Sequence, residues 1–532
     1  MRGPLGRISI GFLNEFTANG PETGMDMREY CRALPMVILI AGGGTARSDA
    51  QTTRPSADEI VRSVDSLASR VVTSGLSSAL GVAIAMDGRT IFSRAYGWAD
   101  ATNHIRADSN TLWYIASTSK SLTGFGVSLL AQQGVLDLAA PISALLPHVK
   151  WPDGVDPSKL TLATFLSHMH HINDQVFVQN AAFTGVVPEA RWAELIPFTS
   201  STGSRDLVYG NFGYNIAAMV IDRKRPEGWR RFLDSAVYAP TGMHQTYACV
   251  SCVDQRRIAK PHRSTPSGGF MTLTFEKTDA TMNSAGGHLA TLHDLARWVI
   301  VQMDSGRIEG NQVFPAQAVG LSHALIARHT VAASKRFGPF EREGWAAGWD
   351  VGSYQGERMV SRFGSYGPTR SHLSMLPGRR TGVVALVTAP GASAATDLIA
   401  ALVYDLEAGR PTARTTATEQ LNALIARVAD ARRRSAVDDS TRRSNPQRLR
   451  RPIHDYVGTY GSPGYGEVMI STRGDALLFR WGVLSGPLQL LNAERDEFEI
   501  EIAASANPVS FHFDGTGSAR SVSIAAVAFQ RK

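Results

Sequence analysis

Residues 113–124, WYIASTSKSLTG, decide how the chain folds, because they place Ser117 and Lys120 three positions apart. Apolar side chains recur at helical spacing after this pair and the run ends at Gly134, which predicts a helix over residues 117–133. Side chains three positions apart lie on the same face of a helix. The lysine amine is therefore expected to lie beside the serine hydroxyl, in the first turn of that helix.

This pair has the chemistry of an activated nucleophile. A serine hydroxyl reacts poorly until a base removes its proton, and a lysine amine is a base only when burial or neighbouring cations lower its pKa. The free N–H groups and the positive dipole end at a helix start also favour a developing oxyanion. The S-x-x-K pattern occurs once in the chain. Chance supplies about one such short pattern in a protein of this size, so the surrounding sequence has to support it.

Strand patterns flank a helix-rich middle region. An amphipathic helix is predicted over residues 57–75, and Asp87-Gly88 separates two apolar runs in the manner of a β-hairpin. Strand patterns return over residues 345–387 and a helix follows near 393–407. Strands at both ends with helices between them predict an α/β sandwich, in which one antiparallel sheet is flanked by helices and carries an inserted helical subdomain.

The N-terminus has the form of an export signal. Arg28 and Arg32 precede the apolar run Ala33–Ala41, which is too short to span a bilayer, and small residues follow it. Residues 1–50 are therefore predicted to be an N-terminal extension and signal peptide. The mature protein is then expected to be periplasmic or secreted, with no transmembrane span. A buried hydrophobic helix is the alternative interpretation.

The rest of the chain divides by composition into three parts. Residues 55–408 form the predicted main domain, and residues 409–452 are a polar, Arg-rich segment that predicts a helical linker. Residues 453–532 contain short strand patterns with turn signals, which predict a small antiparallel β domain. Cys249 and Cys252 are predicted to form a local structural disulfide, as suits an oxidising compartment.

From about residue 58 to residue 400 the chain resembles the superfamily of serine β-lactamases, penicillin-binding proteins (D-alanyl-D-alanine carboxypeptidases) and related esterases, especially its class C branch. The resemblance includes the approach to the nucleophile and the G-x-L-D-L turn after it, and three later motifs in the usual order. These motifs are LTLATFLSH (160–168), NSAGGHLATLHDLARW (283–298) and GWDVGSY (348–354). The C-terminal stretch YVGTYGSPGYGEVMIS resembles the small β domain that many of these hydrolases carry.

The resemblance implies roles for two further motifs. In the first, Tyr209-Gly210-Asn211, the phenol would relay protons between Ser117, Lys120 and the leaving group, and Asn211 would bind the substrate amide and hold the lysine. The second lies on a strand that edges the site, where relatives carry K-T-G or H-x-G. Here it reads Arg362-Phe363-Gly364. The backbone N–H groups of Ser365 and Ser117 would form the oxyanion hole.

Arg362 departs from the usual Lys or His. Its guanidinium suits a substrate carboxylate, but it cannot exchange protons as His does. The sequence therefore predicts that Arg362 orients substrate and biases the pKa of Lys120 or Tyr209. A strand arginine facing solvent is the alternative.

A histidine-rich loop is the second departure, since Ser167-His168-Met169-His170-His171-Ile172 stands where many relatives read S-H-T-S-G-L. These histidines and Asp174 invite a zinc interpretation. The H-x-H-x-D-H pattern fails at Ile172, however, and we expect no metal or other cofactor.

These observations predict a serine hydrolase that acts through an acyl-enzyme on the ester, amide or β-lactam carbonyl of a small molecule or peptide. The net charge of +7 comes without a nucleic-acid-binding motif, so no nucleic-acid partner is predicted. A lack of G-x-S-x-G argues against an α/β-hydrolase. The alternatives are a non-hydrolytic module that binds penicillin or peptidoglycan, or serves as a scaffold, and a zinc-dependent hydrolase.

Overall fold

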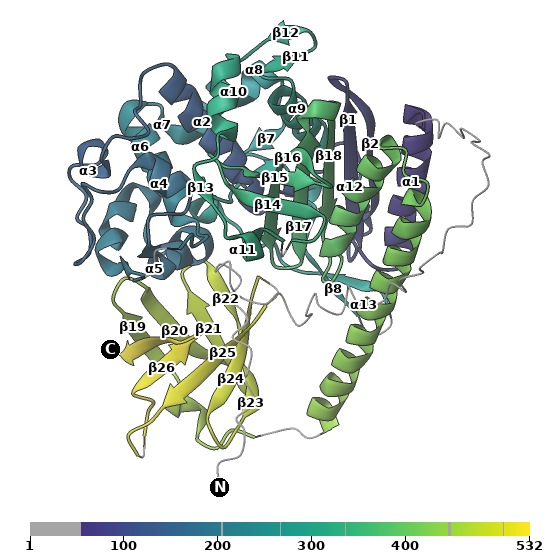
Figure 1. Cartoon of the computed structure of the whole chain (residues 1–532). Coiled ribbons are helices and arrows are strands. Elements are labelled where there is room, and N and C mark those ends of the chain that lie inside the picture. The colour runs from purple at the N-terminus through teal and green to yellow at the C-terminus, as the bar shows by residue number, and fades with distance from the viewer. Residues whose placement is uncertain are drawn as a thin grey trace, which may run out of the picture.

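A computed structural model describes residues 55–532 except 204–205, 266–267, 336, 445–447, 504 and 516. A helix-flanked sheet with a helical subdomain forms the larger part of the molecule, and a smaller β domain lies beneath it in Figure 1. The predicted extension and signal peptide, residues 1–50, lie outside the described residues. This architecture confirms the predicted fold class.

The large sheet has nine antiparallel strands in the order β13-β14-β15-β16-β17-β18-β1-β2-β3. Its centre joins the two ends of the domain, because β1 pairs with β18 from Leu80↔Val387 to Met86↔Thr381. The strands are β1 (Ala79–Met86), β2 (Arg89–Asp100), β3 (Ile105–Arg106), β13 (Ala327–Arg328), β14 (Phe340–Trp345), β15 (Asp350–Tyr354), β16 (Glu357–Tyr366), β17 (Thr369–Leu376) and β18 (Thr381–Val387).

The predicted hairpin joins β1 to β2. Asp87 and Gly88 both have positive φ, 50° and 76°, as a tight two-residue turn between twisted strands requires.

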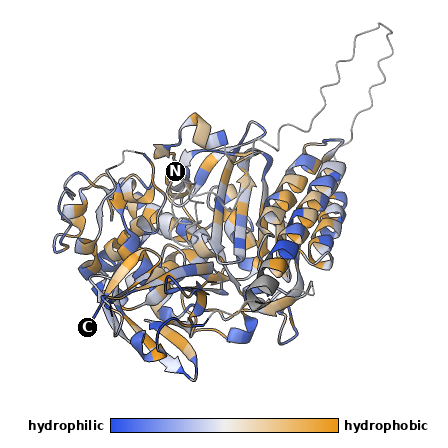
Figure 2. Ribbon diagram, turned by 90° about the horizontal axis from the view of Figure 1, so that it is seen from below, coloured by the Kyte–Doolittle hydropathy of each residue, from blue (hydrophilic) through white to orange (hydrophobic). Residues whose placement is uncertain are grey.

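Helices cover both faces of this sheet. On one face, α1 (Ala57–Thr73), α12 (Ser393–Glu407) and the start of α13 (Ala413–Ser444) enclose an apolar core. On the other face, α2 (Ser119–Gln132) and α9 (Leu292–Met303) belong to a second core. Figure 2 shows hydrophilic and hydrophobic residues alternating along the helices, as expected of elements that bury one side.

The layer formed by α1, α12 and the start of α13 is held by a helix cap at its beginning and by buried side chains at its end. Ser56 caps α1 in a capping box with Glu59, which satisfies two free N–H groups at the helix start. In α13, Ala417, Leu421 and Leu424 are buried at helical spacing against α1 and α12. The first half of the segment predicted as a linker therefore packs into the main domain.

The helical subdomain is formed by residues that follow β3 and precede β13 in the sequence, and it is seen at the left of Figure 1. Its helices are α3 (Ile142–Leu145), α4 (Leu162–Leu166), α5 (Gln175–Gln179), α6 (Phe212–Lys224) and α7 (Gly228–Leu233). Helices α8 (Ala239–Thr241) and α10 (Ala316–His323) lie at the top of Figure 1 near α9, and α11 (Val331–Lys335) follows β13. Short paired strands join these segments: β4 (Trp113–Tyr114), β10 (Leu289–Ala290) and β7 (Thr246–Tyr247); β5 (Ile172–Asn173) and β6 (Ser200–Ser201); β8 (His262–Ser264) and β9 (Phe270–Thr272); β11 (Arg307–Ile308) and β12 (Asn311–Gln312).

The C-terminal domain is a second nine-stranded antiparallel sheet, in which inward and outward side chains alternate. Its strands are β19 (Gly458–Ser462), β20 (Gly466–Arg473), β21 (Ala476–Trp481), β22 (Leu484–Pro487), β23 (Gln489–Asn492), β24 (Glu497–Ile502), β25 (Ser505–His512), β26 (Ser521–Ile524) and β27 (Val527–Arg531). Its core continues into the main domain through Tyr114, Phe183 and Tyr366.

Two further expectations from the sequence concern a disulfide and membrane-spanning helices. Cys249 and Cys252 are joined in a disulfide with their Cα atoms 5.6 Å apart, as the local pair predicted. Within the described ranges, no helix combines the length and the apolar composition needed to cross a bilayer.

Candidate active site

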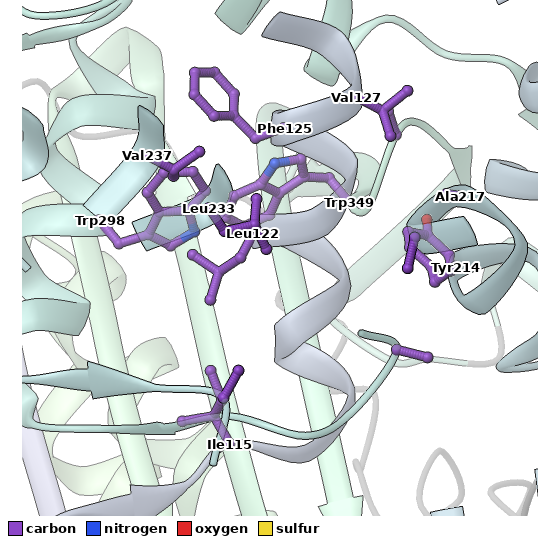
Figure 3. Close-up of a cluster of buried hydrophobic side chains, with 14 of the residues drawn as sticks. Ile115, Leu122, Phe125, Val127, Tyr214, Ala217, Leu233, Val237, Trp298 and Trp349 are labelled. Atoms are coloured by element: carbon purple, nitrogen blue, oxygen red, sulfur yellow. The ribbon is translucent and has the colours of Figure 1, made fainter. Parts of the chain in front are cut away.

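Ser117 lies in a one-turn 3-10 helix, Ala116–Thr118, directly before α2. The preceding residue, Ala116, has φ +46°, a left-handed conformation that costs a non-glycine residue about 1–3 kcal/mol and persists only where its surroundings enforce it. Figure 3 shows the packing that holds α2, with Leu122 and Phe125 against Trp298 and Trp349. Ser117 is thus held in a strained turn directly before a well-packed helix.

Lys120 is fully buried beneath Ser117 and meets three acceptors. Its Nζ donates to Ser117 Oγ at 3.2 Å, Asn211 Oδ1 at 2.5 Å and the Ala285 carbonyl at 3.0 Å. Burial, with a further contribution from the charge of Arg362, lowers the pKa of Lys120 to about 8, although Tyr209 opposes the shift. Three acceptors match the three donors of an ammonium group.

Tyr209 reaches the same point from the loop before α6. Its hydroxyl accepts a 2.6 Å bond from Arg362 Nη2, and Lys120 Nζ lies 5.0 Å from the centre of its ring. Burial acts to raise the pKa of Tyr209, but the positive charges of Arg362 and Lys120 outweigh it and lower the pKa to about 8. The two cations therefore favour loss of the phenol proton, which suits Tyr209 to accept a proton from a neighbouring group.

Arg362 is buried and hydrogen-bonds with protein groups, so it is not a strand arginine that faces solvent. Its Nε donates to the Ser117 carbonyl at 3.0 Å and its Nη1 to Asp350 Oδ2 at 3.1 Å, in addition to the bond to Tyr209. The positive charge of Arg362 acts to lower the pKa of both Lys120 and Tyr209.

Gly364 brings β16 against the nucleophile. A Cβ atom at this position would lie 2.2 Å from the Ile115 carbonyl oxygen and 2.8 Å from the Ser117 nitrogen, so only glycine permits the approach. The pairing of β15 with β16 ends at Asp350↔Ser361, which leaves the following stretch of β16, including Ser365, next to the 3-10 turn. The structure therefore brings the nitrogen predicted for the oxyanion hole into the same neighbourhood as Ser117.

The histidine-rich loop supports the Tyr209–Asn211 segment. His168 Nδ1 accepts the Gly210 N–H at 3.3 Å, and the His168 ring lies 4.7 Å from that of Tyr209. Asp174 accepts the Phe212 N–H at 3.1 Å. His170 stacks on Phe165 instead of joining the other candidate ligands, and among the described residues no three His, Cys, Asp or Glu side chains gather as a metal site.

Two partners of the site were not found by sequence reasoning. The Ala285 carbonyl carries no side-chain signal, although it lies in the quoted stretch 283–298. Asp350 lies in the quoted GWDVGSY motif, and its carboxylate is 1% exposed and paired with Arg362. A strand pattern in the sequence does not show which side chain will face an arginine on another strand. The contact between Asp350 and Arg362 depends on the pairing register of β15 and β16.

The fold and this cluster define the class of protein: it has the β-lactamase/transpeptidase-like fold of serine β-lactamases and penicillin-binding proteins. The family model described as Beta-lactamase matches residues 64–406, so the chain belongs to that family. Unguisins hydrolase ungD of Aspergillus violaceofuscus is 23% identical over 427 residues, which cover 73% of this chain and 72% of that protein.

Solved structures share the fold at low sequence identity. The octameric penicillin-binding protein homologue from Pyrococcus abyssi superimposes with a TM-score of 0.56 at 16% identity, covering 88% of this chain and 99% of that one. The D-amino acid amidase from Ochrobactrum anthropi SV3 does so with a TM-score of 0.52 at 17% identity, covering 62% and 92%. These likenesses show that the chain shares the fold of the two proteins.

Proposed function

We propose that this protein is an acyl-enzyme hydrolase in which Ser117 is the nucleophile and Tyr209 the proton carrier. The observation that carries the proposal is the convergence on Ser117 of a buried ammonium and a phenol whose pKa is lowered to about 8. Cations that stabilise a phenolate beside a serine hydroxyl create a base of suitable strength at neutral to mildly alkaline pH.

The proposed reaction has two halves. The Tyr209 phenolate takes the Ser117 proton as Oγ attacks the substrate carbonyl, and the N–H groups of Ser117 and Ser365 receive the oxyanion. The tetrahedral intermediate then expels the leaving group, which takes the proton from Tyr209. Water repeats the sequence: Tyr209 removes its proton, its oxygen attacks the acyl carbon, and Ser117 leaves with the proton restored.

Lys120 and Asn211 are positioning groups in this scheme. The ammonium of Lys120 stabilises the phenolate and holds Ser117 Oγ, and Asn211 holds the ammonium at 2.5 Å. Esters and amides are the proposed substrates, in keeping with the hydrolase and amidase among the similar proteins. We also propose an exported, periplasmic or secreted location, which is compatible with the disulfide.

Labelling with a fluorescent fluorophosphonate tests this function. The wild-type protein is expected to be labelled and Ser117→Ala is not. Ser119→Ala is the matched control, because Ser119 is buried in the next turn and its Oγ has no hydrogen-bond partner among the described residues. Burst release of one equivalent of product without turnover would instead favour the non-hydrolytic binding module.

A further inference from the structure

Building on the proposed function, we infer that Arg362 is a positioning residue and that the site therefore selects esters and amides with no carboxylate beside the leaving group. A cation on this strand would be expected to receive a substrate carboxylate, and an arginine suits that task by its chemistry. The surroundings of Arg362 commit its guanidinium to the protein instead.

All three guanidinium nitrogens donate to protein acceptors. These acceptors are the Ser117 carbonyl, the Asp350 carboxylate and the Tyr209 hydroxyl, at 3.0, 3.1 and 2.6 Å. The Arg362 side chain is only 3% exposed. Two of its five N–H groups are not used in these bonds, but the burial of the side chain keeps a substrate carboxylate from reaching them without moving the guanidinium away from these partners.

Two aromatic rings also hold the guanidinium in place. It lies 5.4 Å from the centre of the Tyr209 ring and 4.7 Å from that of Trp345, and these two rings are themselves stacked. Trp345 is buried. Rotation of Arg362 toward a ligand would remove the nearer of the two arginine partners of the buried Asp350 carboxylate, and loss of a partner from a buried ion pair is destabilising.

The cations near Ser117 already face protein groups before substrate arrives. Arg362 pairs with Asp350, and in the active form, in which Tyr209 has lost its proton, the phenolate lies beside Arg362 and Lys120. The second Asp350 oxygen lies 3.6 Å from Arg342, so that cation is also drawn to the buried acid. An incoming carboxylate would meet the phenolate at close range, and the juxtaposition of like charges disfavours binding.

The test compares two substrates with the same scissile ester: O-butyrylglycolate, whose carboxylate lies one carbon from the leaving oxygen, and its neutral N-methylamide. The kcat/KM of each ester is divided by its rate of alkaline hydrolysis. We expect this normalised kcat/KM of the wild-type protein to be about tenfold or more higher for the neutral N-methylamide derivative than for O-butyrylglycolate. Equal or faster turnover of O-butyrylglycolate would overturn the inference while leaving the acyl-enzyme proposal intact. Failure of both esters, with Ser117 unlabelled by fluorophosphonate, would overturn both.

Asp350→Asn provides a second measurement that a merely structural role would not move. Removing this anion should raise the use of O-butyrylglycolate relative to its amide about fivefold. It should also shift the acid limb of the kcat/KM profile to lower pH, because the phenolate loses a repelling neighbour. Asp304→Asn is the control, since Asp304 pairs with Arg380 outside the site and its loss should leave the ratio unchanged. An unchanged ratio in folded Asp350→Asn would count against the inference.

Discussion

Two serine-centred clusters lie on opposite faces of the β16–β17 pair, and they differ in access and charge. On one face, Ser117 contacts Lys120 at 3.2 Å. On the other, Ser374 Oγ lies 2.7 Å from His372 Nε2, and His372 Nδ1 lies 2.7 Å from Asp397. The second cluster has the hydrogen-bond connectivity of a Ser-His-Asp triad, so comparing the two clusters shows what a reactive serine needs besides that connectivity.

Hydrogen-bond connectivity alone does not make the second cluster an active site. Ser374 is 1% exposed, and its Oγ is covered by the Tyr404 hydroxyl at 2.7 Å, so a substrate carbonyl has no approach. Ser117 is 9% exposed beside the stretch of β16 that extends beyond its pairing with β15, and it has two cations around it. We conclude that access and charge decide which serine can react.

The largest expected contrast comes from removing each hydroxyl. Ser117→Ala should reduce kcat about 10⁴-fold or more, since the nucleophile of an acyl-enzyme reaction is lost. Ser374→Ala should change kcat less than about threefold. Steady-state turnover of a p-nitrophenyl ester measures both. A loss of turnover in well-folded Ser374→Ala comparable to that of Ser117→Ala would reverse the assignment of the two clusters.

The two tyrosines that meet these serines should differ next most strongly. Tyr209→Phe removes the proposed proton carrier and should lower kcat about 10²–10⁴-fold. Tyr404→Phe removes one buried hydrogen bond and should cost about 1 kcal/mol of unfolding free energy while leaving kcat nearly unchanged. Turnover and urea denaturation of both variants separate these outcomes. Near-normal turnover in Tyr209→Phe would contradict the proposed mechanism.

The pH profile distinguishes the charged cluster from a neutral one. Because the phenolate is the proposed base, kcat/KM should rise with pH through the Tyr209 pKa of about 8. Arg362→Gln removes a cation that lowers this pKa, so the acid limb should move upward by about one pH unit. Arg380→Gln, which removes a cation that pairs with Asp87 and Asp304 instead, should leave the limb where it is. A limb that is unmoved in Arg362→Gln would remove Arg362 as the source of the shift.

The sequence predicted the local part of the site better than its surroundings. Ser117 and Lys120 are related by helical spacing alone, so their contact follows from a separation of three positions along the chain. The fold class was predictable because strand and helix patterns extend over many residues. Asp350 meets Arg362 only through the β15–β16 register, and such long-range pairing leaves no local signal.

The histidine-rich loop illustrates the same limit from the other side. Its residue types invite a metal interpretation, but their function depends on direction. The positive φ of His168 and His171, 61° and 53°, turns the chain so that His168 supports Gly210 while His170 packs on Phe165. Composition cannot show these directions. In the same way, His372 and Ser374 are predictably on one face of a strand, but the carboxylate that completes their cluster comes from α12.

The smallest expected effect on activity sharpens the comparison through stability. His372→Asn should leave kcat/KM within about threefold of wild type but lower the unfolding free energy by about 1–2 kcal/mol, since buried hydrogen bonds to Ser374 and Asp397 are lost. Burial holds the pKa of His372 below its ordinary value of 6.5, so the unfolded chain binds this proton more readily and stability falls as the pH drops below about 6.5.

The His372→Asn variant lacks this titratable group. Its unfolding free energy should therefore fall less between pH 7 and pH 5 than that of the wild type, as urea titrations at the two pH values would measure. His512→Asn, at an exposed histidine of β25, should keep the wild-type dependence. If His372→Asn instead abolished turnover without loss of stability, the second cluster would have to communicate with Ser117 through the sheet. Its serine would still be sealed from substrate, so the face that opens at β16 would remain the place where acyl transfer occurs.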